Sequence, residues 1–347
     1  MTRSVRIKNL VVGGGADVTV QSMTNTRTED VLATVAQIKR LKRAGCDIVR
    51  MSVNTSAAAE AIKAIKREVD VPLVADIHFD HTLALRAIEN GIDKIRINPS
   101  NIGGEKSLRE VAAAAKDQGI PIRVGVNGGS LESSSLERFG YSAEALADSA
   151  LKSVSMLEKC GFYDIVISAK CSEVAMNVAT YRILSEKYDY PLHIGVTEAG
   201  GGDLALAKSY IGIGSLLLDG IGDTIRVSIT GDPVQEVYAA DTMLRAIGLR
   251  KDFVEVISCP TCARTEINVE ALAAEVRRAT AHIRKRYTVA VMGCVVNGVG
   301  EGKHADIGIA GGKEKSALIK HGELIRTVSN DKILEELLRE MKEAGID

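Results

Sequence analysis

Three cysteines near the end of the chain are spaced so that they could bind a metal ion or an iron–sulfur cluster. Cys259 and Cys262 form a Cys-Pro-Thr-Cys pair, and Cys294 follows on a separate segment. Two cysteines separated by two residues can bind one metal or one cluster corner without backbone strain. No fourth cysteine follows, but the carboxylate of Glu301 comes shortly after Cys294. A three-thiolate site with a weaker oxygen ligand or an open position indicates chemistry at the metal.

A structural zinc site is the alternative interpretation of the same cysteines. His304 or His282 could complete a Cys-Cys-Cys-His set, and a Cys-x-x-Cys pair also suits a redox dithiol. A disulfide is not expected, because the first residues do not resemble a secretory signal and no apolar run approaches the ~18 residues of a membrane span. The pattern therefore predicts a cytoplasmic metal site and leaves zinc and a cluster both open.

Composition favours a globular protein that acts on a small molecule. Of the 347 residues, 46% are hydrophobic and 26% charged, which predicts a sizeable core. The net charge of -1 argues against general affinity for nucleic acid or membrane surfaces. With no Trp and four Phe, the chain also lacks a base-stacking platform.

The first part of the chain alternates short β-branched runs with amphipathic helical stretches. Gly45, Gly91, Gly119 and Gly161 follow helical stretches directly before a strand, where helices commonly end. Eight such units with apolar strands predict a closed (β/α)8 TIM barrel, and an open doubly wound sheet is the alternative. The strands are expected at 18–23, 47–53, 71–77, 94–98, 122–126, 164–169, 192–196 and 224–229. The helices are expected at 31–43, 57–68, 83–89, 107–117, 143–159, 174–187, 204–211 and 233–246.

The regular alternation of predicted strands and helices ends near 248–252, where a second domain begins. We predict a barrel domain at 1–250 that binds substrate and a small α/β domain at 251–347 that holds the three cysteines. Its strands are expected at 254–257, 289–291 and 307–309, and its helices at 269–286 and 332–344.

Charged and polar side chains interrupt seven of the eight predicted barrel strands. Most fall near the carboxyl ends of the strands, where TIM barrels place their active sites. One such residue could belong to a core ion pair, but seven strands with the same pattern indicate a binding site. The residues are Arg50, Asp76, His78, Arg96, Arg123, Asn127, Lys170, Glu198, Arg226 and Ser228.

The sign of this charge predicts an anionic ligand. Five cations, Arg50, Arg96, Arg123, Lys170 and Arg226, meet in one mouth of a nearly neutral protein. Guanidinium groups bind phosphate oxygens in bidentate fashion, so a diphosphate suits the arrangement. The carboxylates Asp76 and Glu198 are the candidates for acid–base chemistry.

Further motifs accompany these residues. The second domain contains Arg264-Thr265 after the cysteine pair, Gly-Cys294-Val-Val-Asn-Gly, Gly300-Glu301, and Ala-Asp-Ile-Gly-Ile-Ala-Gly-Gly at 305–312. The barrel contains Gln-Ser-Met-Thr-Asn-Thr at 21–26, Ala-Asp-Ile-His-Phe at 75–79, Arg-Ile-Asn-Pro-Ser-Asn-Ile-Gly at 96–103 and Gly-Val-Thr-Glu-Ala-Gly at 195–200. Over essentially its whole length the chain resembles the 4-hydroxy-3-methylbut-2-enyl diphosphate synthase family, the iron–sulfur enzymes of the methylerythritol phosphate route to isoprenoids. It departs from the family at Val299, where Asn-Gly-Pro-Gly-Glu is usual.

The resemblance implies a [4Fe–4S] cluster on Cys259, Cys262 and Cys294, with Glu301 on the fourth iron. It also implies a two-electron reductive ring opening and dehydration of methylerythritol 2,4-cyclodiphosphate, with flavodoxin or ferredoxin as electron donor. We expect Glu198 and Glu301 to be catalytic. The residues expected to bind the cyclodiphosphate are Arg50, Asp76, His78, Arg96, Arg123, Asn127, Lys170 and Ser228. Two other classes remain open: a zinc-stabilised phosphosugar aldolase or hydrolase, and a cluster that senses redox state.

The junction between the domains predicts a head-to-tail homodimer. The helix at 233–246 returns the chain to the amino ends of the barrel strands, and the short stretch 248–252 leads into the second domain. Crossing a barrel of roughly 25–30 Å takes about eight or more extended residues. The cysteines should therefore cover the partner's barrel rather than their own, and the resemblance implies the same arrangement.

Overall fold

The computed structural model of the chain describes residues 1–296, 300 and 304–347. The chain divides into two compact units, Met1–Leu249 and Arg250–Asp347, which are described separately.

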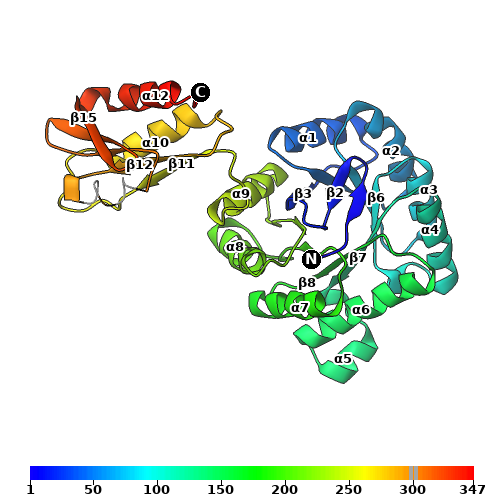
Figure 1. Ribbon diagram of the computed structural model, residues 1–347. Helices are drawn as coiled ribbons and strands as arrows, with labels where there is room; N and C mark the ends of the chain where they lie inside the picture. The colour runs from blue at the N-terminus through cyan, green and yellow to red at the C-terminus, as the bar shows by residue number, and fades with distance from the viewer. Residues whose placement is uncertain (297–299, 301–303) are drawn as a thin grey trace. The chain divides into compact units, whose positions relative to one another are not determined.

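Eight parallel strands form the centre of the first unit (Figure 1). Neighbours along the chain pair from β3 to β8, β10 pairs with both β3 and β9, and a parallel bridge between Ile167 and Leu192 joins β8 to the β9 side. The predicted TIM barrel is therefore confirmed. Its strands are β3 (Thr19–Met23), β4 (Ile48–Ser52), β5 (Leu73–Asp76), β6 (Lys94–Ile97), β7 (Ile122–Asn127), β8 (Ile165–Lys170), β9 (His193–Ile194) and β10 (Thr224–Ile225). The last two are shorter than predicted, because the chain beyond Ile194 and Ile225 leaves the regular ladder.

Helices cover the outside of the barrel. They are α1 (Val31–Arg43), α2 (Ser56–Glu68), α3 (His81–Glu89), α4 (Glu105–Asp117), α5 (Ser133–Phe139), α6 (Ala143–Lys159), α7 (Val174–Lys187), α8 (Gly202–Leu218) and α9 (Pro233–Ala246). Side chains cap several of their amino ends, as when Asp30 accepts a hydrogen bond from the Ala33 amide. The four glycines predicted to follow helices all have positive φ, from +63° to +98°.

Helix α8 runs seven residues further than predicted, to Leu218. Gly212 and Gly214 interrupt its pattern, but Gly212 lies so close to Val196 that a Cβ there would come within 2.6 Å of the valine side chain. Close packing on the barrel thus stabilises a segment whose glycines alone would favour a break.

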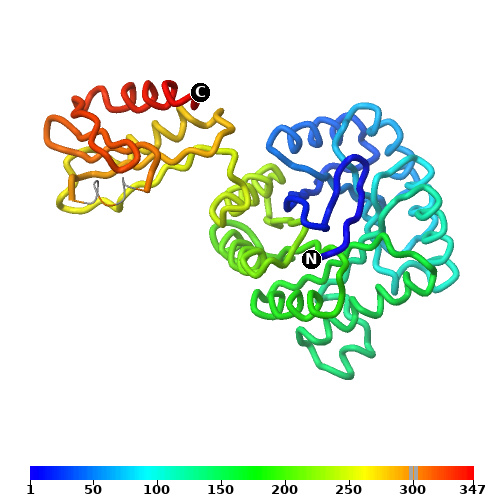
Figure 2. Tube along the Cα trace, viewed as in Figure 1, coloured from blue at the N-terminus to red at the C-terminus, as the bar shows by residue number. Residues whose placement is uncertain are grey.

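A short hairpin at the amino terminus, β1 (Val5–Ile7) with β2 (Leu10–Val12), is absent from the sequence-based prediction. Its side chains Ile7 and Val12 pack with Ile48 and Val74, which lie near the amino ends of β4 and β5. The hairpin therefore covers the amino-end opening of the barrel (Figure 2).

The second unit contains one mixed five-stranded sheet in the order β11-β12-β13-β14-β15, in which the first three strands are parallel. Its elements are β11 (Val254–Ser258), α10 (Val269–Thr280), β12 (Tyr287–Met292), β13 (Ile307–Ala310), β14 (Lys315–Lys320), β15 (Glu323–Ser329) and α12 (Ile333–Glu343). Helix α10 ends six residues before the predicted 286, ahead of the strongly basic stretch 284–286. The antiparallel pair β14–β15 is an addition to the prediction. Short 3-10 turns lie at Pro99–Asn101 and Gly128–Ser130 in the first unit and at Asn330–Lys332 in the second.

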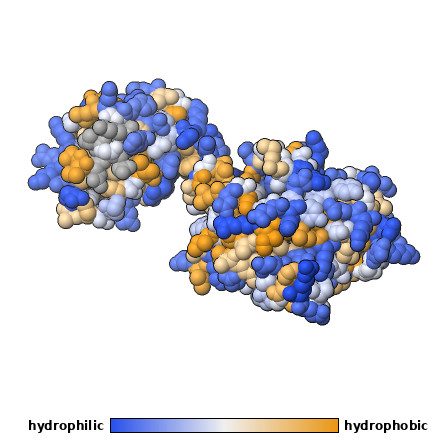
Figure 3. All heavy atoms as spheres, turned by 60° about the horizontal axis from the view of Figure 1, so that its bottom comes forward, coloured by the Kyte–Doolittle hydropathy of each residue, from blue (hydrophilic) through white to orange (hydrophobic). Residues whose placement is uncertain are grey.

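The surfaces of both units carry intermixed hydrophilic and apolar residues on the face shown in Figure 3. None of the helices in the described ranges is long and apolar enough to span a membrane.

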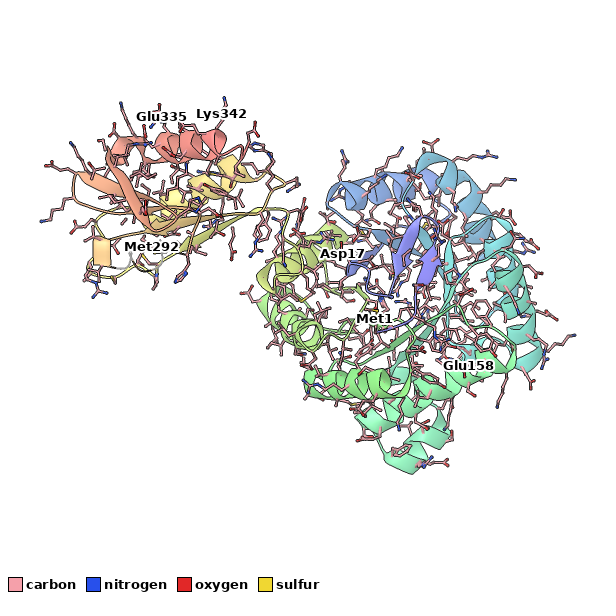
Figure 4. The ribbon with its side chains drawn as sticks, in the orientation of Figure 1. Met1, Asp17, Glu158, Met292, Glu335 and Lys342 are labelled. Atoms are coloured by element: carbon pink, nitrogen blue, oxygen red, sulfur yellow. The ribbon has the colours of Figure 1, made fainter. Side chains whose placement is uncertain are left out.

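Side chains of the strands fill the space that the barrel encloses (Figure 4), and one of them is an unusual core residue. Lys94 begins β6 and is fully buried, yet its Nζ has no hydrogen-bond partner in the part of the chain that the structure describes. Burial, followed by the positive charges of Arg123 and Arg50, lowers the pKa of Lys94 well below its ordinary value. A TIM barrel normally fills such positions with branched apolar side chains. Burial of this amine without a partner is therefore expected to oppose folding.

We predict that Lys94→Met raises the free energy of unfolding by about 1–3 kcal/mol at neutral pH, because it replaces an unpaired polar group by an apolar one of similar length. The folded state binds fewer protons at this lysine than the unfolded state, so the destabilisation shrinks as the pH rises toward the ordinary lysine pKa. Denaturant unfolding at two pH values measures the effect, and the gain should be larger at the lower pH. The exposed Lys39→Met on α1 is the control, expected within about 0.5 kcal/mol of wild type. A less stable Lys94→Met protein at both pH values would contradict this assignment.

Candidate active site

A cavity of about 230 Å³ lies at the carboxyl ends of the barrel strands. All eight residues predicted to bind substrate line it, so the structure brings them together from strands that are far apart in sequence. The lining consists of Arg50, Asp76, His78, Arg96, Arg123, Asn127, Ser168, Lys170, Thr197, Arg226 and Ser228.

A larger hollow of about 710 Å³ lies elsewhere in the first unit, but it suits an anionic ligand less well. It is lined by the first residues of the chain and by loops before the strands, including Asp189 and Asp223. Both carboxylates are already engaged: Asp189 accepts from Arg3, and Asp223 accepts from the Thr2 hydroxyl and the Leu192 amide at 2.7 Å each. The smaller cavity has the convergent charge, and active sites of TIM barrels lie at its end of the barrel.

The strand register explains why these side chains converge. Alternate residues of a parallel strand face the same side, so Arg50 and Ser52, or Arg123 and Asn127, share the inner face. Across the ladder Arg96 is level with Asp76 on one side and with Arg123 on the other, and Asn127 is level with Lys170.

Asp76 is the carboxylate at the centre of the cavity's cations. Its Oδ1 lies 3.3 Å from Arg96 Nη1, and its Oδ2 lies 3.9 Å from Arg50 Nε and 3.4 Å from His78 Nε2. Burial alone would raise the pKa of Asp76, but the charge of Arg50, the His78 hydrogen bond and the charge of Arg96 together hold it well below its ordinary value. Asp76 is therefore a permanent anion that orients arginines, and it is poorly suited to donate a proton.

Neither Arg123 nor Lys170 forms an ion pair with a carboxylate among the residues that the structure describes. Arg123 is 1% exposed, and its Nε and Nη1 have no hydrogen-bond partner within the described ranges. Burial and the neighbouring cations lower the pKa of Lys170 well below its ordinary value, with Arg123 the first of those cations. Since buried cations without partners are unfavourable, an anion in the cavity would relieve both.

Arg226 and Arg50 have protein partners instead. Arg226 forms a two-pronged pair with Glu236 of α9, at 2.9 and 3.1 Å, and Glu236 also accepts from the Ser22 hydroxyl. Arg50 Nη2 lies 2.9 Å from the sulfur of Met23, and burial lowers the pKa of Arg50 to about 10. Arg226 thus lines the mouth as predicted, but its charge is already balanced.

Sequence reasoning missed Ser168 and Thr197 as lining residues. Ser168 could have been found, because it lies two residues before Lys170 on the same strand and so faces the same way. Glu198 follows Thr197 directly and is exposed rather than part of the lining. Its backbone adopts φ +55°, which is uncommon for a non-glycine residue and clusters at functional sites.

Two of the predicted cluster ligands, Cys259 and Cys294, lie at one end of the second unit's sheet. Cys259 directly follows β11 and Cys294 follows β12 by two residues, and these neighbouring strands are parallel. Met292, labelled in Figure 4, ends β12 at this edge. The Gly293 amide donates to Cys259 Sγ at 3.2 Å, a contact of the kind that supports thiolate ligands.

The loop of Cys262 is held by Thr265. The Cys262 amide donates to Thr265 Oγ1 at 3.2 Å, and a Cβ on Gly293 would come within 2.8 Å of Thr265 Cγ2. Gly293 therefore allows a close approach between its own backbone and the Thr265 side chain. Glu301 lies outside the described residues, as do 297–299.

The three thiols are ligands of the type that binds an iron–sulfur cluster, although the described side chains do not lie close enough together to hold one. Among the residues that can be described, no group of three or more Cys, His, Asp and Glu side chains is close enough to hold a metal. His282 precedes β12 and His304 precedes β13, so both come before the amino ends of strands, whereas Cys259 and Cys294 follow the carboxyl ends of β11 and β12. This placement favours a cluster over the Cys-Cys-Cys-His zinc alternative, and three thiols, one of which accepts from the Gly293 amide, suit a cluster.

Two family models match the chain almost end to end. Residues 2–241 match the GcpE TIM-barrel domain and residues 255–343 match the GcpE protein C-terminal domain. The chain is 57% identical over 343 residues to 4-hydroxy-3-methylbut-2-en-1-yl diphosphate synthase (flavodoxin) of Caldanaerobacter subterraneus subsp. tengcongensis, covering 99% of this chain and 97% of that protein. Proteins of the same name from Fusobacterium nucleatum and Thermotoga maritima are each 52% identical, covering 99% and 97% of this chain and 97% and 96% of theirs.

Solved structures of low identity support the barrel alone. Dihydropteroate synthase of Stenotrophomonas maltophilia aligns with a TM-score of 0.52 at 13% identity, over 71% of this chain and 98% of its own. An N-acetylneuraminic acid synthetase of Leptospira borgpetersenii aligns with a TM-score of 0.51 at 14% identity, over 81% and 99%. The two family models and the identity over nearly full length place this chain in the 4-hydroxy-3-methylbut-2-en-1-yl diphosphate synthase (GcpE) family.

Proposed function

We propose that this chain catalyses the reductive ring opening and dehydration of 2-C-methyl-D-erythritol 2,4-cyclodiphosphate to 4-hydroxy-3-methylbut-2-en-1-yl diphosphate in isoprenoid biosynthesis. The reaction consumes two electrons and two protons and releases one water. The observation that carries the proposal is the cavity of five cations with one lining carboxylate, on a chain of this family.

The barrel, residues 1–250, binds the cyclodiphosphate. Arg96, Arg123 and Lys170 hold the two phosphates, since Arg123 and Lys170 form no ion pair with a carboxylate of the described residues and Arg96 lines the same cavity. Asp76 keeps Arg50 and Arg96 in place. The remaining polar groups, His78, Asn127 and Ser228, donate hydrogen bonds to the substrate's oxygens.

Residues 251–347 hold the redox centre. Cys259, Cys262 and Cys294 bind a [4Fe–4S] cluster, with Glu301 as the fourth, more readily displaced ligand. When bound, the cluster supplies the two electrons one at a time, and the flavodoxin named for the relatives is the proposed donor. Glu198, exposed beside the mouth on a left-handed backbone, supplies a proton as hydroxide leaves as water.

The protein works in the cytoplasm as a head-to-tail homodimer. Seven residues, 247–253, separate α9 from β11, too few to run the length of a barrel and around its rim. Helix α8 also exposes three apolar side chains spaced seven residues apart, Leu204 at 68%, Ile211 at 62% and Leu218 at 72%. Such a stripe along one helix face suits contact with a second copy.

The direct test is turnover of the cyclodiphosphate by protein purified without oxygen and supplied with a low-potential reductant. Formation of the open-chain diphosphate is expected, together with about four irons per chain. Zinc in place of iron would favour the aldolase class, and an intact cluster without turnover would favour a redox sensor.

Substrate affinity should depend on pH through Lys170. Its pKa is lowered in the free protein, and an anionic ligand favours its protonated form, so binding above that pKa takes up a proton. We therefore expect affinity to fall as pH rises, by up to about tenfold per pH unit. Asp76 stays ionised over this range, because the charge of Arg50, the His78 hydrogen bond and the charge of Arg96 hold its pKa well below its ordinary value. Isothermal titration calorimetry across pH measures the slope. Lys170→Arg should flatten it, and a flat wild-type profile would exclude this role.

The two kinds of proposed cluster ligand should fail differently. Cys262→Ser should lose the cluster, because a thiolate ligand is removed. Glu301→Ala should retain it, since three thiolates remain, but turnover should fall at least about tenfold. Iron and sulfide analysis beside anaerobic turnover separates the two outcomes. Wild-type turnover in Glu301→Ala would contradict the assignment of Glu301 as a functional cluster ligand.

Mixed dimers test where the active site forms. Glu198→Ala damages only the barrel and Cys262→Ser damages only the cluster domain. If each site combines one subunit's barrel with the other's cluster, a mixed dimer has one intact site and activity returns. Refolded or co-expressed heterodimers, isolated with two different tags, provide the sample. Inactive heterodimers of confirmed composition would overturn the head-to-tail arrangement.

A further inference from the structure

Two positions on the inner face of the barrel carry no side chain, and a cation occupies the space beside each. Gly125 lies in β7, level with Ser168, and Gly195 directly follows β9. A Cβ on Gly125 would lie 2.7 Å from both Cζ and Nη2 of Arg96 and closer still to Nε. A Cβ on Gly195 would lie 2.5 Å from Lys170 Nζ.

Backbone conformation does not explain these glycines. Eighteen glycines of the described chain have positive φ, and neither Gly125 nor Gly195 is among them. An alanine could adopt either backbone without the strain that positive φ imposes. What both positions use is therefore the absence of a side chain.

We propose that Gly125 and Gly195 are positioning residues, whose missing side chains let Arg96 and Lys170 lie across the inner wall of the cavity. The inference rests on the proposed function, because it assigns these two cations to the substrate's phosphates. Each glycine makes room for a cation that comes from another strand. Two uncharged residues therefore determine where two charged groups of the cavity lie.

The contacts of Arg96 show what the glycine allows. Its Nη2 donates to the Gly125 carbonyl at 3.1 Å, and its Nη1 lies 3.3 Å from Asp76 Oδ1 and 3.2 Å from His78 Nε2. The guanidinium is thus held between the Gly125 carbonyl and the Asp76 carboxylate. A methyl group on Gly125 would overlap the guanidinium and would force it away from these two partners.

The two glycines differ in what a substitution would disturb. At Gly125 the three nearest atoms all belong to the far end of the Arg96 side chain, which can rotate away while the fold persists. At Gly195 a Cβ would also meet the backbone carbonyl of Arg226 at 2.6 Å, so the strands would have to separate. Gly125→Ala is therefore the informative variant.

The test compares wild type, Gly125→Ala and the matched control Gly214→Ala, all purified anaerobically with the cluster in place. Gly214 is also buried, in α8, and the nearest atom to an added Cβ there is Met243 Sδ at 3.9 Å, an ordinary contact. Calorimetric titration with the cyclodiphosphate should show binding at least about tenfold weaker for Gly125→Ala, since a charge-assisted contact is lost. Gly214→Ala should bind as wild type does.

A second measurement needs no ligand. Arg96 is 7% exposed, so phenylglyoxal should modify it slowly in wild type and faster in Gly125→Ala, as mapped by mass spectrometry. In an Arg96→Lys background, Gly125→Ala should weaken binding less than about twofold further, because lysine lacks the colliding atoms. This coupling is not expected of a glycine that serves packing alone.

The outcomes separate this inference from the proposed function. Equal affinity and equal Arg96 reactivity in wild type and Gly125→Ala would overturn the positioning role. If wild type fails to bind the cyclodiphosphate while Gly125→Ala still exposes Arg96, the positioning role stands and the proposed substrate is wrong. Weaker binding with unchanged reactivity and no coupling to Arg96→Lys would also overturn it, since the loss would then arise elsewhere.

Discussion

Uncompensated positive charge inside the barrel is the constraint on which the rest of the structure depends. Asp76 pairs with Arg50 and Arg96, and Glu236 pairs with Arg226, but neither Arg123 nor Lys170 forms an ion pair with a carboxylate of the described residues. Buried charge without a partner opposes folding. The fold therefore maintains a cavity whose electrostatics become favourable only when an anion enters, and a diphosphate has the charge and the oxygen geometry to do so.

The remainder of the first unit must stabilise that arrangement. Apolar side chains between the strands and the outer helices form one continuous core, which includes fully buried residues such as Ile62, Leu108 and Leu157. The hairpin β1–β2 covers the amino end of the barrel with Ile7 and Val12. Solvent therefore reaches the polar groups of the barrel interior mainly through the mouth. Parallel strands bring their carboxyl ends to one edge, and for this reason side chains from β4 to β10 can meet in one small volume.

The sequence predicted the barrel and the lining because both depend on local pattern. A charged side chain within a buried apolar strand must face a partner or a polar cavity, because burying it unpaired is unfavourable. The strand pattern alone was therefore enough to assign Arg50, Arg96 and Arg123 to the mouth. The hairpin was missed because its strands have three residues each, too few to show a period. Glu236 resembled an ordinary helix surface residue, and only the packing of α9 shows that it pairs with Arg226.

Tertiary context also hides the role of Gly125 and Gly195. In a sequence, a glycine suggests a turn or a flexible point. Here each glycine instead leaves space for a side chain that comes from another strand. In the second unit, Cys259 and Cys294 follow neighbouring parallel strands and so lie at the same end of the sheet, as a shared site requires. The ligand set itself stays a prediction, because Glu301 lies outside the described residues and the thiols are not assembled.

The claim that barrel charge holds the substrate is tested most directly by calorimetry on full-length Cys262→Ser protein, in which the proposed cluster is absent and the barrel is unchanged. The account predicts one cyclodiphosphate bound per chain, with a Kd within about tenfold of the cluster-loaded enzyme, because the phosphates meet the same cations in both. Absence of detectable binding by folded, cluster-free protein would contradict it and would assign the binding energy to the cluster domain.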